Sequence, residues 1–408
     1  MKKIILLFFI LLITCISCNK QEIVKLKKGT YRAFLKVQDN QELPFIIEVK
    51  NDTLLTIVNA EERIIVDEIS YKNDSVYIQT PVYEGYIVAK IKKNNTLEGS
   101  FIKESLDRIV PFIAENKTER FPIKNNKPQV NISGNWETVF SDNSIKDRYI
   151  AKGIFKQKNN KVTGTFRTTT GDYRYLEGVI DGDSLKLSTF DGAHAFLFTA
   201  KIKDSVMSGF FYSGNHWKEP FKAKLNNNYE LPNEEDLTYL KEGYKTLAFS
   251  FPNESGEIIS LKDKEFKNKI VLVQIMGTWC PNCLDESKFY VNYLKENPNS
   301  NVKIIGLAFE VAKTKEAAFK RMKRLKDRIG IEYPLLLADF GNIADKAMAQ
   351  SKLPMLNHIL SYPTTIFLDK KGTVRKIHTG FNGPATGKKY DEFKIEFNQF
   401  MNLLINEN

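Results

Sequence analysis

The sequence predicts a C-terminal α/β domain, built on a mixed sheet flanked by helices, that follows a duplicated and mainly antiparallel all-β region. Residues 27–225 contain short alternating segments separated by Asn-Asp, Asn-Asn and Asp-Gly turns, and they lack long helical patterns. This pattern is typical of antiparallel strands. Residues 246–408 instead combine continuous apolar strand segments with amphipathic helical ones. The second pattern is typical of parallel strands joined by crossover helices.

An internal repeat divides the β-rich region into two similar halves. Corresponding segments follow in the same order with an almost constant spacing: Gly29-Thr30-Tyr31 with Gly134-Asn135-Trp136, Asp74-Ser75 with Asp183-Ser184, Ala89-Lys90-Ile91-Lys92 with Ala200-Lys201-Ile202-Lys203, and Pro111-Phe112 with Pro220-Phe221. We therefore expect two β-domains, at residues 27–122 and 131–225, each a small sandwich or barrel-like unit. Chance resemblance between two β-rich segments is the alternative.

Composition and charge indicate an ordinary globular protein. A chain of 408 residues is long enough for two or three domains. The formal net charge of +11 comes from lysines that are interleaved with acidic residues, and no stretch alternates basic with aromatic residues as a nucleic-acid groove would. We therefore expect a solvated basic surface and no nucleic-acid partner.

The N-terminus, residues 1–18, has the pattern of a secretory signal peptide with a lipobox. A basic start is followed by an apolar run at residues 4–13, which is shorter than the roughly 20 residues that span a bilayer as a helix. Ser17 directly precedes Cys18, which resembles the site where a bacterial lipoprotein is acylated. We therefore expect a lipid on Cys18 that holds the protein at a membrane. Acylation of Cys15, or a signal that is simply cleaved, are the alternatives.

The cysteine content then singles out one pair. Of four cysteines, Cys15 and Cys18 lie in the signal region, and with Cys15 removed and Cys18 acylated, as expected above, the mature protein keeps only Cys280 and Cys283. An exported protein with a single pair, two residues apart, is not a scaffold held together by disulfides. The pair therefore needs a chemical explanation.

A polar, acidic stretch at residues 226–245 is expected to link the β-domains to the domain at 246–408. The expected elements there are a hairpin at 249–261, strands at 269–275 and 302–309, helices at 281–296 and 313–329, a short strand at 335–337, a hairpin of strands 364–368 and 373–377, and a closing helix at 391–405. A βαβ crossover followed by a hairpin and a helix is the element order of thioredoxin. The basic face of the helix at 313–329, with Lys320, Arg321, Lys323 and Arg324, is expected to be solvated.

The segment Trp279-Cys280-Pro281-Asn282-Cys283 lies where a buried strand turns into a helix. Because proline suits the first helical position, Cys280 is expected at the N-cap, where the helix dipole and unpaired N–H groups lower a thiol pKa. We expect Cys280 to be the exposed nucleophile and Cys283 to be the shielded thiol that resolves the mixed disulfide.

A metal site, a haem site and a purely structural role each fit the Cys-x-x-Cys pair less well than redox chemistry does. A zinc site needs two more ligands, and the four histidines are scattered. A c-type haem site needs a histidine after the second cysteine, where this chain has Leu284. A structural disulfide that closes so short a loop would stabilise little. Redox chemistry is therefore predicted, with no metal and no organic cofactor.

Three more positions extend the predicted site. Tyr362 and Pro363 open a strand after a loop, so their peptide bond is a candidate for the cis form, with an ordinary trans turn as the alternative. In a thioredoxin arrangement Pro363 packs across the disulfide, and the Tyr362 backbone offers hydrogen bonds to an extended substrate. Glu286 shares a helix face with Cys283 and is a candidate acceptor for its proton, although it could instead only complement the helix dipole.

Residues 269–286 and 362–371, with the closing helix, resemble the TlpA/ResA-like thiol-disulfide oxidoreductases, membrane-attached members of the thioredoxin superfamily. The family's acid after the Cys-x-x-Cys pair corresponds to Glu286. Thioredoxin itself buries an aspartate where this chain has Gln274, which strengthens Glu286 as the proton acceptor. The preceding β-rich region resembles the extended lipoproteins of this family in Bacteroidetes-type bacteria.

The resemblance implies a reductase of disulfides in other extracytoplasmic proteins, with Trp279, Pro281, Tyr362 and Pro363 positioning the substrate. It also implies a membrane thiol donor of electrons and a periplasmic, membrane-anchored lipoprotein of a Gram-negative bacterium.

Two other functions remain open. A peroxiredoxin-like peroxidase would carry threonine three residues and proline seven residues before its reactive cysteine, but Gly277 and Val273 precede Cys280 at these distances. A lipid-anchored receptor could bind a ligand on its β-domains through aromatic residues such as Phe211, Tyr212 and Trp217, which core or rim packing explains equally well.

Overall fold

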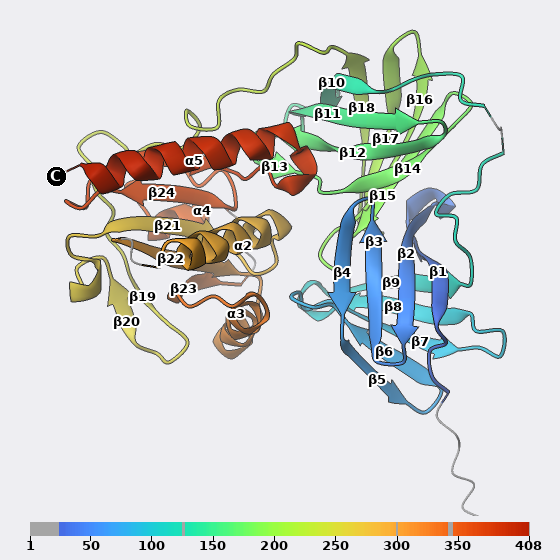
Figure 1. The fold of residues 1–408 in the computed structure, drawn as a ribbon, viewed down its shortest axis with the longest axis horizontal. Helices are drawn as coiled ribbons and strands as arrows, with labels where there is room; N and C mark the ends of the chain where they lie inside the picture. The colour runs from blue at the N-terminus through green and yellow to red at the C-terminus, as the bar shows by residue number, and fades with distance from the viewer. Residues whose placement is uncertain (1–23, 125–126, 299–300, 342–345, 408) are drawn as a thin grey trace, which may run out of the picture.

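The computed structural model describes residues 24–124, 127–298, 301–341 and 346–407. Figure 1 shows two β-sheets packed end to end and an α/β domain beside them. The N-terminal segment for which we expect a signal peptide, with Cys15 and Cys18, lies outside the described residues. In the part of the chain that is described, no helix is long and apolar enough to cross a membrane.

The first β-sheet is an antiparallel meander. Its strands are β1 (Gly29–Lys36), β2 (Glu42–Asn51), β3 (Leu54–Asn59), β4 (Glu62–Val66), β5 (Glu68–Lys72), β6 (Ser75–Gln79), β7 (Tyr86–Ile91), β8 (Leu97–Lys103) and β9 (Arg108–Glu115), with short 3₁₀ helices η1 (Gln38–Asn40) and η2 (Glu104–Leu106). The first strand pairs with the last, and β4 and β5 form the two edges, so the sheet curls around its core without closing.

The second β-sheet repeats this order and closes into a barrel, which we call the second barrel. Its strands are β10 (Gly134–Phe140), β11 (Tyr149–Lys158), β12 (Lys161–Thr168), β13 (Gly171–Asp172), β14 (Leu176–Asp181), β15 (Ser184–Phe190), β16 (Ala195–Lys203), β17 (Val206–Ser213) and β18 (Trp217–Leu225). Closure comes from the pairing of β11 with β12, which leaves only β13 outside the ring. The predicted fold class, a duplicated antiparallel region, is confirmed.

The first sheet and the second barrel share a core. Phe190 and Leu197 of the barrel belong to the buried cluster of the first sheet. The rings of Phe45 and Phe190 stack with centroids 4.2 Å apart. Stacked aromatic pairs of this kind stabilise a contact beyond the area that they bury. The two β units therefore form one packed body.

The α/β domain has a five-stranded mixed sheet in the order β23-β22-β21-β24-β25. Its strands are β21 (Ile270–Met276), β22 (Val302–Glu310), β23 (Leu335–Phe340), β24 (Thr364–Leu368) and β25 (Val374–Thr379). Its helices are α2 (Pro281–Glu296), α3 (Lys315–Ile329), α4 (Lys346–Lys352) and α5 (Lys388–Asn406). The smaller elements are a hairpin of β19 (Ser250–Pro252) and β20 (Ile258–Ser260) and the 3₁₀ helices η3 (Lys264–Phe266) and η4 (Pro384–Thr386). The expected thioredoxin-like order is confirmed, and the short α4 was not expected.

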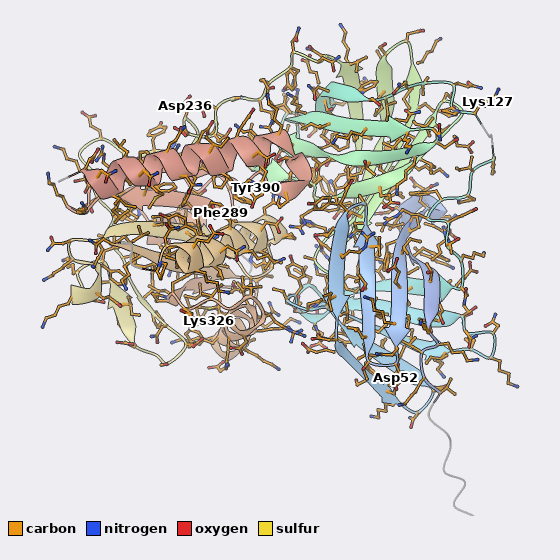
Figure 2. All side chains as sticks on the ribbon, viewed as in Figure 1. Asp52, Lys127, Asp236, Phe289, Lys326 and Tyr390 are labelled. Carbon is orange, nitrogen blue, oxygen red and sulfur yellow. A yellow bond between two sulfur atoms is a disulfide. The ribbon has the colours of Figure 1, made fainter. Side chains whose placement is uncertain are left out.

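Every residue of β21 is buried because both faces of the sheet are covered. Leu272 and Met276 face a core shared with α2, α3 and α5, whereas Val273 and Ile275 face α4 and the β19–β20 hairpin. Figure 2 labels Phe289 on α2, whose ring packs edge-on against rings of α5. This packing holds the start of α2 firmly at the carboxyl end of β21.

The helix α3 exposes only part of its basic face: Lys320 and Lys323 are exposed as expected, but Arg321 and Arg324 are not. Arg321 pairs with Glu84 of the first sheet at 2.5 Å, and Arg324 donates a hydrogen bond to the Thr80 carbonyl oxygen at 2.8 Å. The prediction of a solvated face is therefore wrong for Arg321 and Arg324, because the acidic edge of the first sheet docks on this helix.

The segment 226–245, for which we expect a linker, runs along the α/β domain. Glu234 pairs with Lys389 at 3.0 Å, and Leu240 forms an isolated bridge with Leu356. The predicted domain boundaries at 225 and 246 stay a proposal.

Candidate active site

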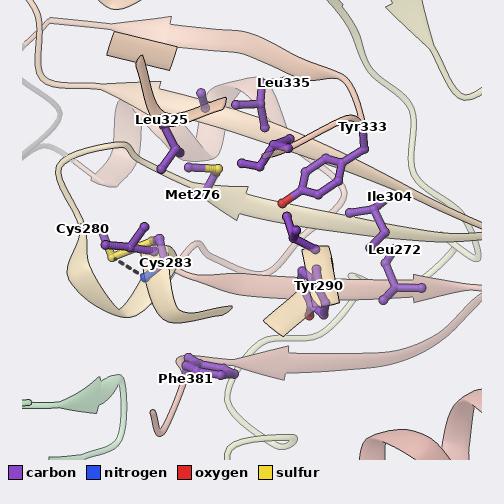
Figure 3. Close-up of a cluster of buried hydrophobic side chains, with 14 of the residues drawn as sticks. Leu272, Met276, Cys280, Cys283, Tyr290, Ile304, Leu325, Tyr333, Leu335 and Phe381 are labelled. Carbon is purple, nitrogen blue, oxygen red and sulfur yellow. Dashed lines mark hydrogen bonds between the residues drawn. A yellow bond between two sulfur atoms is a disulfide. The ribbon is translucent and has the colours of Figure 1, made fainter. Parts of the chain in front are cut away.

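Cys280 and Cys283 form a disulfide at the start of α2, with their Cα atoms 5.3 Å apart. Cys280 is the N-cap residue and Pro281 occupies the first helical turn, as the sequence predicts. The Cys283 N–H donates to the Cys280 Sγ at 3.2 Å (Figure 3). A sulfur in this position faces the positive end of the helix dipole, which favours its thiolate form when the disulfide is reduced.

Cys280 is less exposed than we expected. Its exposed fraction is 6%, against 0% for Cys283, so the order of exposure is as predicted but the prediction of an exposed nucleophile is wrong. β13 of the second barrel contacts the same segment at Asn282, whose Nδ2 donates to the Asp172 carbonyl oxygen at 3.2 Å. A Cβ added to Gly171 would lie 2.1 Å from the Asn282 Nδ2, so glycine permits this close approach.

The loop before β24 completes one side of the disulfide. The Tyr362–Pro363 peptide bond is cis, as expected. The Tyr362 carbonyl oxygen lies 3.4 Å from the Cys280 Sγ. The Trp279 and Tyr362 rings meet edge-on, with centroids 5.5 Å apart, and the Trp279 Nε1 donates to the Phe309 carbonyl oxygen at 2.9 Å. These contacts bring together Trp279, Cys280, Tyr362 and Pro363, four residues that the sequence predicts to share one site.

Glu286 lies fully buried beneath the disulfide, and three side chains surround its carboxylate. Gln274 Nε2 donates to it at 2.8 Å, Thr365 Oγ1 at 3.0 Å and Tyr290 OH at 3.1 Å. Burial raises the pKa of Glu286 to about 7, and these hydrogen bonds oppose the rise. A carboxyl group with such a pKa can both accept and release a proton near neutral pH.

Gln274 connects this acid to the second cysteine. Its Nε2 lies 3.4 Å from the Cys283 carbonyl oxygen as well as 2.8 Å from Glu286, and its Oε1 accepts from Ser287 at 3.1 Å. The buried amide therefore orients the carboxylate toward the helix turn that carries Cys283. Tyr290, whose hydroxyl donates to Glu286, lies about two turns after Cys283 along α2 and is labelled in Figure 3.

Glu310 is a second buried acid at the site, and it was not predicted from the sequence. It ends β22 and accepts hydrogen bonds from the Thr278 N–H at 2.8 Å and the Thr278 Oγ1 at 2.6 Å. Burial raises its pKa to about 7, against the effect of the Thr278 hydrogen bonds. Glu310 thus holds the backbone two residues before Cys280. Its only signal in the sequence was its position as an acidic residue at the end of a buried apolar strand.

Arg174 of the second barrel is also part of the site and was not predicted. Its buried guanidinium donates to the Pro281 carbonyl oxygen at 3.3 Å and pairs with Asp285 of α2 and Glu62 of β4. Asp191 lies 3.6 Å from its Nε. No local pattern marks this residue, because its partners come from three distant segments of the chain.

A cavity of about 800 Å³ lies between the second barrel and the disulfide. Cys280, Trp279 and Tyr362 line one side, and Tyr149, Phe211 and Trp217 line the other. Among the described residues, no cluster of three or more histidine, cysteine or acidic side chains could hold a metal ion.

The fold and the site define a thioredoxin-like protein with a Cys-x-x-Cys disulfide. The sequence model of the AhpC/TSA family matches residues 243–377. The thioredoxin-like protein YneN of Bacillus subtilis is 30% identical over 141 residues, which are 35% of this chain and 73% of that protein. The thiol-disulfide oxidoreductase ResA of Halalkalibacterium halodurans is 28% identical over 146 residues, which are 36% of this chain and 72% of that protein.

A solved structure of a thiol-disulfide oxidoreductase from Bacteroides fragilis is 22% identical and covers 37% of this chain and 99% of that one, with a TM-score of 0.26. On the sequence relatives, the chain belongs to the TlpA/ResA-like members of the thioredoxin superfamily, and it is an oxidoreductase of disulfides.

Proposed function

We propose that the protein is a lipid-anchored, extracytoplasmic reductase that breaks disulfides in other proteins through Cys280 and Cys283. The observation that carries this proposal is the disulfide at the N-terminus of α2, which lies between cis-Pro363 and a buried carboxyl group whose pKa is about 7. A helix N-terminus favours the attacking thiolate, and the carboxyl group serves the second thiol.

The reaction has two exchange steps. The Cys280 thiolate attacks one sulfur of a substrate disulfide, the substrate S–S bond breaks, and the first substrate sulfur leaves as a thiolate that takes a proton from water. Glu286, as a carboxylate, then takes the proton of Cys283. Gln274 contacts both the Glu286 carboxylate and the Cys283 carbonyl oxygen, so it holds the acid beside this turn of the helix. The resulting Cys283 thiolate attacks the Cys280 sulfur, which leaves the Cys280–Cys283 disulfide and releases the second substrate sulfur as a thiolate that takes up a proton, while Glu286 gives its proton back to water.

The neighbouring residues position the substrate. The Tyr362 carbonyl oxygen, 3.4 Å from the Cys280 Sγ, is placed to accept a hydrogen bond from an extended substrate. Pro363 and Trp279 keep this loop against the disulfide, and Pro281 sets the first turn of α2.

The location and the electron supply belong to the same proposal. A lipid on Cys18 would hold the protein at a periplasmic membrane surface of a Gram-negative cell. Each turnover leaves the dithiol oxidised, so a dithiol of a membrane protein must reduce it again. A Cys18→Ser variant is expected to leave the membrane fraction of cells.

The equilibrium reduction potential of the Cys280–Cys283 couple against glutathione tests the direction of catalysis. We expect a value near that of thioredoxin, about −270 mV, or lower. A value near about −120 mV would instead indicate an oxidant that donates disulfides. Failure to form the disulfide at all would contradict redox function and favour the receptor alternative.

Trapping separates the two cysteines. With a reduced Cys283→Ser variant, a disulfide substrate should accumulate as a stable mixed disulfide on Cys280. The matched Cys280→Ser variant should trap nothing, because Cys283 is fully buried.

A peroxidase function has little support. The positions three and seven residues before Cys280 are Gly277 and Val273, and the nearby Thr278 hydroxyl is bonded to Glu310.

A further inference from the structure

The cavity at the active site has two walls that come from different parts of the chain. One wall is formed by residues 279–282 and 360–362 of the α/β domain, and the other is the mouth of the second barrel. Its volume of about 800 Å³ is in the range of ligand-binding cavities. Because the Cys280 side chain is only 6% exposed and lines this cavity, a group that forms a disulfide with Cys280 must lie inside it.

The barrel wall contains four aromatic side chains among polar and charged ones. Tyr149, Tyr173, Phe211 and Trp217 line the cavity. Tyr173 and Phe211 are in contact, with ring centroids 5.3 Å apart, and extend the aromatic core of the barrel to its mouth. Mouths of β-barrels are common places for ligand sites.

Trp217 is the unpartnered member of this wall. It lies two residues before the buried Glu219 on β18, so both side chains share the inward face of the strand. Glu219 is 5% exposed, whereas Trp217 is 42% exposed. In the described ranges, no other aromatic ring packs against Trp217. A large inward-facing indole is thus left open to the cavity.

The polar groups behind the wall are already satisfied by one another. Tyr149 OH donates to the Glu219 carboxylate at 2.8 Å, and Ser141 Oγ donates to its other oxygen at 2.6 Å. The hydroxyls of Tyr149 and Tyr173 lie 2.6 Å apart. This network holds the tyrosine rings in place, so that their faces line the cavity beside the charged residues 146–148.

We propose that the mouth of the second barrel is a substrate subsite, which binds an aromatic side chain next to the cysteine that is exchanged. This proposal rests on the proposed function. While the substrate cysteine is bonded to Cys280, the substrate residue next to that cysteine lies across the cavity from Trp279 and contacts Trp217. Offset or edge-on contact between such rings stabilises this mixed disulfide. Trp217 is therefore a specificity-determining residue supplied by the β-region.

The test uses two peptide substrates and the full chain. Each substrate is a symmetric disulfide dimer of a six-residue peptide with one cysteine, preceded by phenylalanine in one peptide and by glycine in the other. The protein is purified in detergent, reduced with dithiothreitol and freed of it. In a single turnover the dithiol gives two electrons to the dimer, which becomes two thiol peptides, while Cys280 and Cys283 form their disulfide.

We expect the phenylalanine peptide to react about 10-fold faster than the glycine peptide. In Trp217→Ala this ratio should fall to about one, because the favoured contact is lost. The ratio is insensitive to general structural damage, which slows both reactions alike. Phe210→Ala is the matched control, since Phe210 is 41% exposed on the neighbouring strand but does not line the cavity, and its ratio should stay that of the native protein.

Equal rates for the two peptides with the native protein, or a ratio that Trp217→Ala leaves unchanged, would overturn the subsite. Failure of the native protein to reduce either peptide would instead contradict the proposed function, and the subsite with it.

Discussion

Arg174 of the second barrel donates a hydrogen bond to the carbonyl oxygen of Pro281, 3.3 Å away, within the Cys-Pro-Asn-Cys segment. The same guanidinium pairs with Asp285 of α2, Glu62 of the first sheet and Asp191 of the barrel. One buried side chain thus joins both β units to the helix that carries the disulfide. The β-region is therefore part of the active site and not a separate appendage.

Replacing Arg174 by methionine should destabilise the whole protein. The change leaves Glu62, Asp191 and Asp285 partly or fully buried without their common cation, which costs about 3–5 kcal/mol when one partner of a buried ion pair is removed. Urea unfolding followed by tryptophan fluorescence measures the loss. Arg375→Met, which removes a partly exposed pair with Glu407, is the control and should change little. Similar unfolding midpoints for both variants would contradict the assigned role of Arg174.

The contact of β13 with the Cys-x-x-Cys dipeptide should make Gly171 intolerant of a side chain. An alanine Cβ there would collide with Asn282 at 2.1 Å and displace its hydrogen bond to Asp172. We expect Gly171→Ala to lower the thermal midpoint and to speed alkylation of reduced Cys280 by iodoacetamide. Gly256→Ala is the control. Gly256 also has a positive φ, but nothing lies within 4 Å of a Cβ added there. The control should show backbone strain alone, without a change in alkylation.

Glu286→Gln should slow the resolving step by about 100-fold, because a positioned general base commonly contributes 10²–10⁴-fold. In the native protein the rate of resolution should rise with pH through about 7, as the carboxyl group loses its proton. The glutamine variant should lack this rise. Quenched-flow measurement of the mixed disulfide checks both effects. An unchanged pH profile in Glu286→Gln would show that another group takes the proton.

Glu286 should also make stability depend on pH. Its pKa in the folded protein, about 7, lies above its ordinary value of 4.5, so the folded chain binds this proton more tightly than the unfolded chain. The stabilisation is complete below about pH 4.5 and is lost as pH rises through about 7, by roughly 3 kcal/mol. Urea unfolding between pH 4.5 and 8 should show a smaller decline for Glu286→Gln than for the native protein. Glu396→Gln, an exposed acid on α5, should decline as the native protein does.

Local patterns were sufficient for much of the α/β domain. The continuous apolar run of β21, the N-cap cysteine with proline after it, and the proline that opens β24 each depend on neighbours in the sequence. The positions of Glu286 and Gln274 also followed, because one helical face and one strand position set them. The solvated face predicted for α3 was wrong for Arg321 and Arg324, since the acidic residues that bind them belong to the first sheet and carry no mark of that contact.

The sequence by itself determined that Cys280 and Cys283 are the reactive pair, that Cys280 caps α2 and Cys283 lies within its first turn, and that the β pattern is repeated. Helix capping and strand alternation are local properties of a chain, so both can be predicted from neighbouring residues. Only the tertiary structure decided that Cys280 is covered, that Arg174 and Glu310 hold its loop, and that the second barrel faces it across a cavity. Those relationships depend on packing between segments that are far apart in the chain, and such packing is set by the combined shape and charge of whole surfaces.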